Sequence, residues 1–231
     1  MITVVKSGER HHRDMGWLST HWHFSFADYY DPANMNWGVL RVFNDDVVRP
    51  GQGFGAHSHR DMEIVTYVLE GELEHRDNQG NTGVVHPGEV QVMSAGTGIV
   101  HSEYNHSKEN PVHFIQLCIP RTKGLTPRWA QRQFTLEDQR GRLLPVVSSG
   151  DIPETLTIDQ DAAIYVSHLG AGQEVAHKSQ AGRKAYLFVI GGGLKLNGVP
   201  LTAGDQARIA DEPELMLEAT EDVELILLDL P

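Results

Sequence analysis

The chain has 231 residues, 40% of them hydrophobic, which suits one large domain or two of about 100 residues and excludes a disordered protein. Its 31 Asp and Glu outnumber 19 Lys and Arg, for a net charge of −12 without basic clusters, which argues against a nucleic-acid surface. The only cysteine, Cys118, cannot form an intramolecular disulfide, and neither a signal peptide nor a membrane helix of roughly 20 apolar residues is evident. We therefore expect a soluble, cytoplasmic protein.

Short apolar or alternating runs separated by turn residues predict β-strands along most of the chain. In chain order, these runs are residues 38–48, 63–76, 89–95, 112–120, 185–196 and 224–230. Turn signals such as Gly80-Asn81, Pro87-Gly88 and Asn197-Gly198 lie between them. Helical periodicity is weak, and only residues 126–140 are expected to hold a turn or two of helix. Many short strands with frequent turns predict an all-β sandwich or barrel.

An internal repeat divides the chain into two similar halves. His57 is followed fourteen residues later by Gly71, and His177 is followed at the same spacing by Gly191. A glycine-containing segment precedes each histidine, and a hairpin-like segment follows each glycine. We interpret the repeat as two copies of one β unit, in residues 1–130 and 159–231, joined by a connecting segment at 131–158.

The first copy contains two pairs of side chains that can bind a metal. His57 and His59 are two residues apart, as are His101 and Glu103, so each pair points to one face of a strand. If the two segments are neighbours in one barrel, three nitrogens and a carboxylate oxygen converge, a set that suits Fe, Mn, Co, Ni or Cu at roughly 2.0–2.2 Å. Four ligands around an octahedral ion leave two positions open for substrate.

Other histidines show that spacing alone is not sufficient. His21 and His23 have the same spacing but no carboxylate partner, and we interpret them as structural. Single histidines without a matching partner are expected to have structural or surface roles, and they are His75, His86, His106 and His113. Of these, His113 begins the apolar run expected to pass near His101. His177 is interpreted as the remnant of a lost site, and Cys118 as a small buried hydrophobic residue.

Two segments resemble motifs of a known family. Gly51, His57, His59, Glu63 and Gly71 are similar to the first cupin motif. The segment GIVHSEYN, residues 98–105, is similar to the second. Finer details, in WLSTHWHFSFADYYDP, GFGAHSHRDMEIVTYVLEG and MSAGTGIVHSEYN, resemble the pirin family of the cupin superfamily and its bacterial quercetin 2,3-dioxygenase-like members. The resemblance extends over nearly the whole chain and is strongest from about Gly16 to Pro120.

One position departs from the cupin pattern and affects the ligand set. The usual spacing would place a liganding glutamate at residue 64, which is Ile64 here, and strand alternation turns the neighbouring Glu63 away. In pirins the carboxylate ligand is the glutamate two residues after the third histidine, which corresponds to Glu103. The resemblance thus implies that His57, His59, His101 and Glu103 bind the metal and that Glu63 is an acid outside the ligand set.

The resemblance implies two cupin barrels packed face to face, with one divalent metal ion in the N-terminal barrel. Iron is expected, with Mn, Co, Ni, Cu or Zn as alternatives. It also implies a dioxygenase that cleaves flavonols such as quercetin with O2 to a depside and carbon monoxide, with Glu103 as the base that removes the 3-hydroxyl proton. Phe54, Met62, Met93 or Phe114 could line the substrate site or belong to the core.

Two other functions remain open from the sequence. The first is a metal-binding regulatory protein of the pirin type, which would act on a protein partner without robust catalysis. The second is a cupin isomerase acting on a sugar. Neither a nucleic acid nor a membrane is expected as a direct partner.

Overall fold

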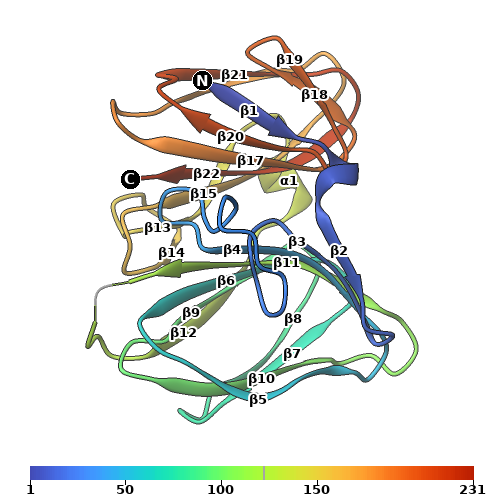
Figure 1. The fold of residues 1–231 in the computed structure, drawn as a ribbon, viewed down its shortest axis with the longest axis vertical. Helices are drawn as coiled ribbons and strands as arrows, with labels where there is room; N and C mark the ends of the chain where they lie inside the picture. Colours follow the sequence, from blue (N-terminus) through green and yellow to red (C-terminus); the bar gives the residue numbers. More distant parts are fainter. Residues whose placement is uncertain (122) are drawn as a thin grey trace. The chain divides into compact units, whose positions relative to one another are not determined.

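The computed structural model describes residues 1–121 and 123–231, and it consists almost entirely of β-strands (Figure 1). The all-β prediction is therefore confirmed. Every run that predicted a strand contains one, whereas residues 126–140 contain strand β12 (Arg128–Gln133) and the four-residue helix α1 (Leu136–Gln139). None of the helices within the described ranges is long and apolar enough to cross a membrane.

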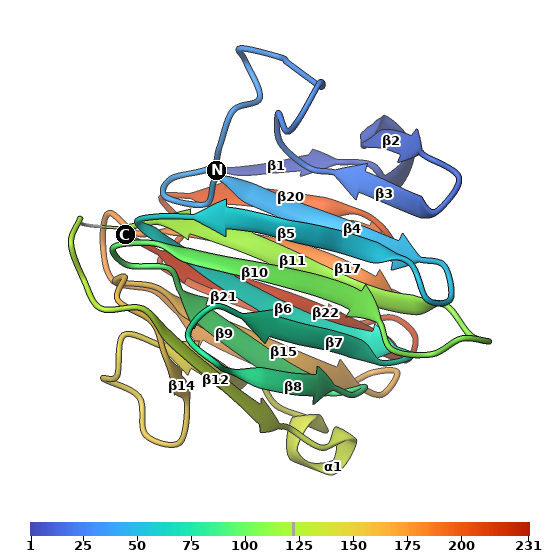
Figure 2. The same ribbon diagram turned by 90° about the horizontal axis from the view of Figure 1, so that it is seen from below.

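The strands group into two compact units, which we call the N-terminal and C-terminal units. The N-terminal unit comprises residues 11–134 and 158–160. Its strands are β2 (His11–Asp14), β3 (Leu18–Trp22), β4 (Val42–Val48), β5 (Gly53–His59), β6 (Met62–Glu70), β7 (Leu73–Asp77), β8 (Thr82–Val85), β9 (Glu89–Ser94), β10 (Ile99–Asn105), β11 (Val112–Pro120) and β12. They form a seven-stranded sheet in the order β12-β9-β6-β11-β4-β3-β2 and a four-stranded sheet in the order β5-β10-β7-β8. Figure 2 shows the four-stranded sheet in front.

The C-terminal unit comprises residues 1–10, 135–157 and 161–231. Its elements are β1 (Ile2–Val5), the 3-10 helix η1 (Ser7–Glu9), α1, β13 (Leu144–Ser148), β14 (Leu156–Thr157), β15 (Ala163–Leu169), β16 (Glu174–Lys178), β17 (Lys184–Gly191), β18 (Gly193–Leu196), β19 (Val199–Thr202), β20 (Gln206–Ala210), β21 (Glu214–Ala219) and β22 (Val223–Leu230). The sheets have the orders β1-β20-β17-β22-β15-β13-β14 and β16-β21-β18-β19.

The two units repeat one topology, as the sequence repeat predicts. Strand β5 pairs with β10 as β16 pairs with β21, and β6 lies between β9 and β11 as β17 lies between β20 and β22. One edge strand has a different origin in each unit: β12 completes the sheet beside β9, whereas β1, from the start of the chain, completes the sheet beside β20. Residues 1–10 consequently group with the C-terminal unit.

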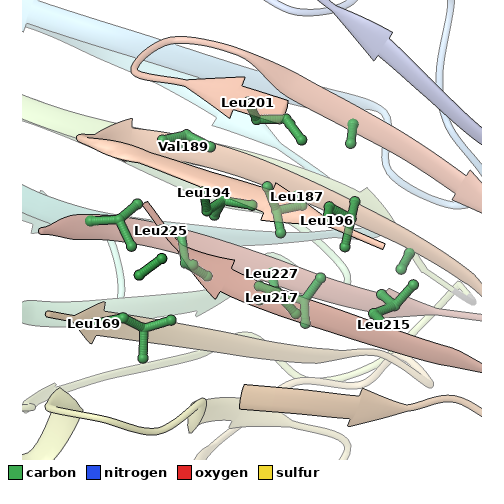
Figure 3. Close-up of a cluster of buried hydrophobic side chains, with 14 of the residues drawn as sticks. Leu169, Leu187, Val189, Leu194, Leu196, Leu201, Leu215, Leu217, Leu225 and Leu227 are labelled. Carbon is green, nitrogen blue, oxygen red and sulfur yellow. The ribbon is translucent and has the colours of Figure 1, made fainter. Parts of the chain in front are cut away.

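Each unit has an apolar core between its two sheets. In the C-terminal unit this core consists largely of leucines, including Leu187, Leu215, Leu217 and Leu227 (Figure 3). In the N-terminal unit the inward positions are less uniform. Asn44 and Asp46 lie between Val42 and Val48 on the same face of β4, and they are also buried. The N-terminal unit therefore keeps polar side chains where the C-terminal unit is apolar.

Candidate metal centre

Strands β5 and β10 bring three predicted histidines together. His57 and His101 are directly opposite each other in the antiparallel pair, and His59 follows two residues after His57 on the same face. The ring centroid of His101 lies 4.4 Å from the ring centroid of His57 and 5.1 Å from that of His59. One nitrogen of each ring lies within 4.8 Å of those of the other two. The three imidazoles therefore surround a single point.

His57 and His101 each leave a ring nitrogen available for a metal ion. Nδ1 of His57 lies 2.8 Å from the carbonyl oxygen of Gly55 and donates to it, so Nε2 is the free acceptor. Nε2 of His101 is buried and has no hydrogen-bond partner within the described part of the chain. A buried nitrogen without a partner is costly, and a cation at the centre of the cluster would satisfy it.

Burial also keeps the rings of His59 and His101 neutral, which is the protonation state that binds metals. It lowers the pKa of His101 to about 3, helped by the neighbouring His57 and His75. It likewise lowers the pKa of His59 to about 4, helped by His101 and His57. A cluster of three imidazoles fits a divalent transition metal ion.

Glu103 lies beside the histidines at an irregularity of the strand pair. The β5–β10 register shifts between His101 and Glu103, as expected of a β-bulge. The Glu103 carboxylate groups with His75 and His101, with ligand atoms within 4.8 Å of one another, and its charge raises the pKa of His59. Nε2 of Gln116 donates to both carboxylate oxygens, at 3.1 and 2.9 Å. These bonds fix the buried carboxylate next to the cluster.

The cluster opens into an apolar cavity of about 330 Å³, at the lower end of the usual range for ligand pockets, about 300–1,000 Å³. His57, His59 and Glu103 contribute to its lining. The apolar walls come mainly from Met15, Trp17, Leu18, Trp22, Phe26, Val42, Phe54 and Cys118. The arrangement suits a flat, mostly apolar molecule with oxygen atoms that can reach a metal ion.

The structure adds His75, which the sequence analysis had treated as an isolated histidine. His75 is fully buried on β7, next to β10, and its Nδ1 lies 3.5 Å from Nδ1 of His101. Its Nε2 lies 3.1 Å from Oδ2 of Asp77, and its ring stacks on Trp129. In the sequence, only the two-residue spacing of His75 and Asp77 indicated that the two side chains lie on one face of a strand. The pairing of β7 with β10 brings His75 next to His101, and this long-range contact is not visible in the local sequence.

Asn44 and Asp46 of β4 also line the cavity, and the sequence analysis had not identified them. Both are buried, and Oδ1 of each has no hydrogen-bond partner in the described structure. Burial raises the pKa of Asp46 from 3.8 to about 7; the charges of Asp45 and Glu103 add to this effect, and the hydroxyl of Thr20 opposes it. Together with Gln116, they add polar groups to a wall that is otherwise apolar away from the cluster.

The other candidate residues lie outside the histidine cluster. Glu63 accepts a hydrogen bond from the hydroxyl of Ser94 at 2.6 Å. Its side chain therefore lies outside the ligand set, as strand alternation predicts. Nε2 of His113 lies 2.7 Å from Oδ1 of Asp45, so the run beginning at His113 does not bring its ring to His101. His21 lies 4.0 Å from the same Asp45.

The candidates for the substrate site divide between the cavity and the core. Of the four, only Phe54 is among the residues that line the cavity. Met62 and Met93 belong to one apolar cluster with Cys118, and Phe114 belongs to another. Cys118 also lines the cavity, and burial raises its pKa to about 12, so it is a neutral thiol as expected.

The C-terminal unit lacks the equivalent cluster in the part that the structure describes. His177 occupies the position of His57, but its partner across the strand pair is Leu215, where the N-terminal unit has His101. Leu217 follows two residues later, in the place of Glu103, and both leucines are in the apolar core. His177 instead forms a 2.7 Å contact with Asp229.

Two family models match the chain. Residues 3–119 match the model described as Pirin, and residues 145–230 match the model described as Quercetinase C-terminal cupin domain. Together with the two repeated β units, these matches confirm the prediction of two cupin-like domains.

The chain is similar to known proteins and solved structures over all or nearly all of its length. A quercetin 2,3-dioxygenase of Escherichia coli K12 is 45% identical over 233 residues, covering 100% of this chain and 99% of that protein. A pirin-like protein of Caulobacter vibrioides is 44% identical over 217 residues, covering 94% of each. The crystal structure of the bacterial pirin YhhW from E. coli with nickel(II) has a TM-score of 0.95 and 44% identity, covering 100% of this chain and 99% of that one.

Proposed function

The chain belongs to the pirin family, and on that basis we propose that it is a metal-dependent dioxygenase that cleaves flavonols such as quercetin with O2. The products would be a depside and carbon monoxide. The observation that supports this proposal is the convergence of His57, His59 and His101 beside Glu103 at an apolar cavity. That combination provides both a metal site and a slot for an aromatic substrate.

We assign one divalent ion to His57, His59, His101 and Glu103, with iron as the expected metal. The nickel(II) complex of the related E. coli pirin supports a divalent ion in this family. When bound, the ion would act as a Lewis acid that polarises the oxygens of the flavonol and favours loss of the 3-hydroxyl proton.

The protein's own residues would orient the flavonol and accept its proton. Glu103 is the base, because its carboxylate lies at the cluster and faces the cavity. Gln116 donates to both carboxylate oxygens through its amide nitrogen, which would hold Glu103 in a fixed orientation while its oxygens still accept. Apolar side chains such as Trp22 and Phe54 would cover the flavonol rings and exclude water.

Oxygen consumption and carbon monoxide release test this proposal directly. Metal-free protein is loaded separately with Fe, Mn, Co, Ni, Cu or Zn, quercetin is added, and both gases are followed. We expect one O2 consumed and one carbon monoxide released per flavonol with at least one metal, and neither with metal-free protein. Absence of turnover with all six ions in protein that has bound them would refute the dioxygenase function.

A further inference from the structure

Two buried polar atoms belong to residues on the wall of the cavity and have no hydrogen-bond partner among the described residues. Oδ1 of Asn44 and Oδ1 of Asp46 lack a hydrogen-bond partner within residues 1–121 and 123–231, and the two side chains are only 4% and 2% exposed. Leaving such an atom unsatisfied costs about 1–3 kcal/mol, and here two occur on one strand. Because the residues are two apart on β4, they face the same side, which is the cavity.

On the neighbouring strands the Thr20 hydroxyl acts on the Asp46 carboxyl, but Oδ1 of Asn44 and Oδ1 of Asp46 have no hydrogen-bond partner among the described residues. Strand β4 lies between β11 and β3, where Gln116 is opposite Asn44 and Thr20 is opposite Asp46. The amide nitrogen of Gln116 is directed to Glu103 and to the hydroxyl of Thr66. Both residues line the cavity, so a ligand bound there can reach these two acceptors.

The two acceptors and the histidines belong to different sheets. Asn44 and Asp46 are on the seven-stranded sheet, whereas His57, His59 and His101 are on the four-stranded sheet. The cavity is lined by residues of both sheets and is otherwise mostly apolar. A complementary ligand therefore has an aromatic body, oxygen atoms that reach the histidine cluster, and hydrogen-bond donors that reach Asn44 and Asp46.

We propose that Asn44 and Asp46 form an acceptor pair that binds free phenolic hydroxyl groups of a flavonol whose 3-hydroxyl is held at the histidine cluster. This inference rests on the proposed function and narrows its substrate class to polyhydroxylated flavonols. A buried site that hydrogen-bonds a hydroxyl group strongly rejects analogues without it, because the acceptors then remain unpaired. Asn44 and Asp46 are thus specificity-determining residues.

The binding of two flavonols tests the acceptor pair. Quercetin and 3-hydroxyflavone share the 3-hydroxyl and 4-keto groups, but 3-hydroxyflavone lacks every other hydroxyl. Calorimetric titration of nickel-loaded protein without O2 should show quercetin binding at least about tenfold more tightly, the equivalent of about one strong hydrogen bond. Asn44→Leu and Asp46→Leu should each remove most of this advantage and leave the affinity for 3-hydroxyflavone within about twofold.

A matched control and the metal content make the result specific. Asp45→Asn alters the neighbouring carboxylate, which contacts His113 on the opposite face of β4, and should preserve the discrimination. Nickel content is measured for each variant, so that a lost metal is not mistaken for a lost hydrogen bond.

Three results would overturn the inference. If the leucine variants bind both flavonols with the wild-type ratio, the acceptor pair is wrong and the dioxygenase proposal stands. If wild-type protein binds quercetin and 3-hydroxyflavone equally, the pair is wrong even where a variant fails to fold. Binding of neither flavonol would refute the proposed function and this inference together.

Discussion

Nδ1 of His75 lies 3.5 Å from Nδ1 of His101, which places a second imidazole behind the one that faces the metal site. Nε2 of His75 lies 3.1 Å from Asp77. Burial raises the pKa of Asp77, but hydrogen bonds from Asn81 and His75 outweigh it and hold the pKa below its usual value. The ionised carboxylate accepts from His75 Nε2, so Nδ1 of His75 accepts from His101. Nε2 of His101 then keeps its lone pair for the metal.

We expect His75→Phe to lower the affinity for nickel(II) about 10- to 100-fold, because the hydrogen bond that orients His101 is lost. The phenyl ring can keep the stacking on Trp129. Competition with a chelator of known affinity measures the change. His86→Phe is the control, since this side chain is half-exposed and contacts Glu72. Equal affinity in both variants would contradict the positioning role.

His101→Ala should lower the bound metal sharply, whereas His21→Ala should not. His101 is at the centre of the cluster, and His21 lies near Asp45 outside it. Elemental analysis of both purified variants gives the metal per chain. Equal metal loss in the two would show that the ion is held elsewhere.

Glu103→Gln should reduce quercetin turnover by about 10²- to 10⁴-fold and reduce metal content much less. The amide keeps an oxygen near the cluster but cannot accept a proton as a carboxylate does. Oxygen uptake and metal content are measured on the same sample. Undiminished turnover would remove the assignment of Glu103 as the base.

Gly53→Ala should destabilise the N-terminal unit by about 1–3 kcal/mol and lower metal occupancy. A Cβ at residue 53 would overlap the carbonyl oxygen of Glu103 and lie 2.5 Å from Cα of Tyr104, which would separate β5 from β10. Gly55→Ala is the matched control, because its nearest contact would be the Tyr104 hydroxyl at 3.8 Å. Urea unfolding of both variants tests the difference, and similar losses would contradict the role of close strand approach.

Asp46→Asn should stabilise the metal-free protein at pH 8 and have little effect near pH 4. The folded-state pKa of Asp46 is raised from 3.8 to about 7, so folding favours the protonated carboxyl. The protonated Asp46 carboxyl does not lower the free energy of unfolding below about pH 4. Between about pH 4 and pH 7 the carboxyl ionises more readily in the unfolded chain, so the free energy of unfolding falls as pH rises. At about 1.36 kcal/mol per pKa unit, the gain at pH 8 is a few kcal/mol. Urea unfolding with a chelator at the two pH values measures it, and a pH-independent gain would exclude ionisation as the cause.

The sequence predicts most of the strands and the three clustered histidines, because both depend on local spacing. The apolar run at residues 63–76 is realised in β6 and β7, and His57 and His59 share one face as alternation requires. The roles of His75 and Asp46 could not be predicted in this way. His75 matters because β7 pairs with β10, and Asp46 because β4 faces the cavity, and both depend on the order of strands in the sheets.

The origin of strand β1 has a consequence for synthesis on the ribosome. Residues 2–5 leave the ribosome long before residues 206–209, with which they pair. The first segment must therefore wait with its backbone groups unpaired while the N-terminal unit forms from residues 11–134 and 158–160. A fragment beginning at residue 11 would expose the edge of β20, which is a site for aggregation through strand pairing.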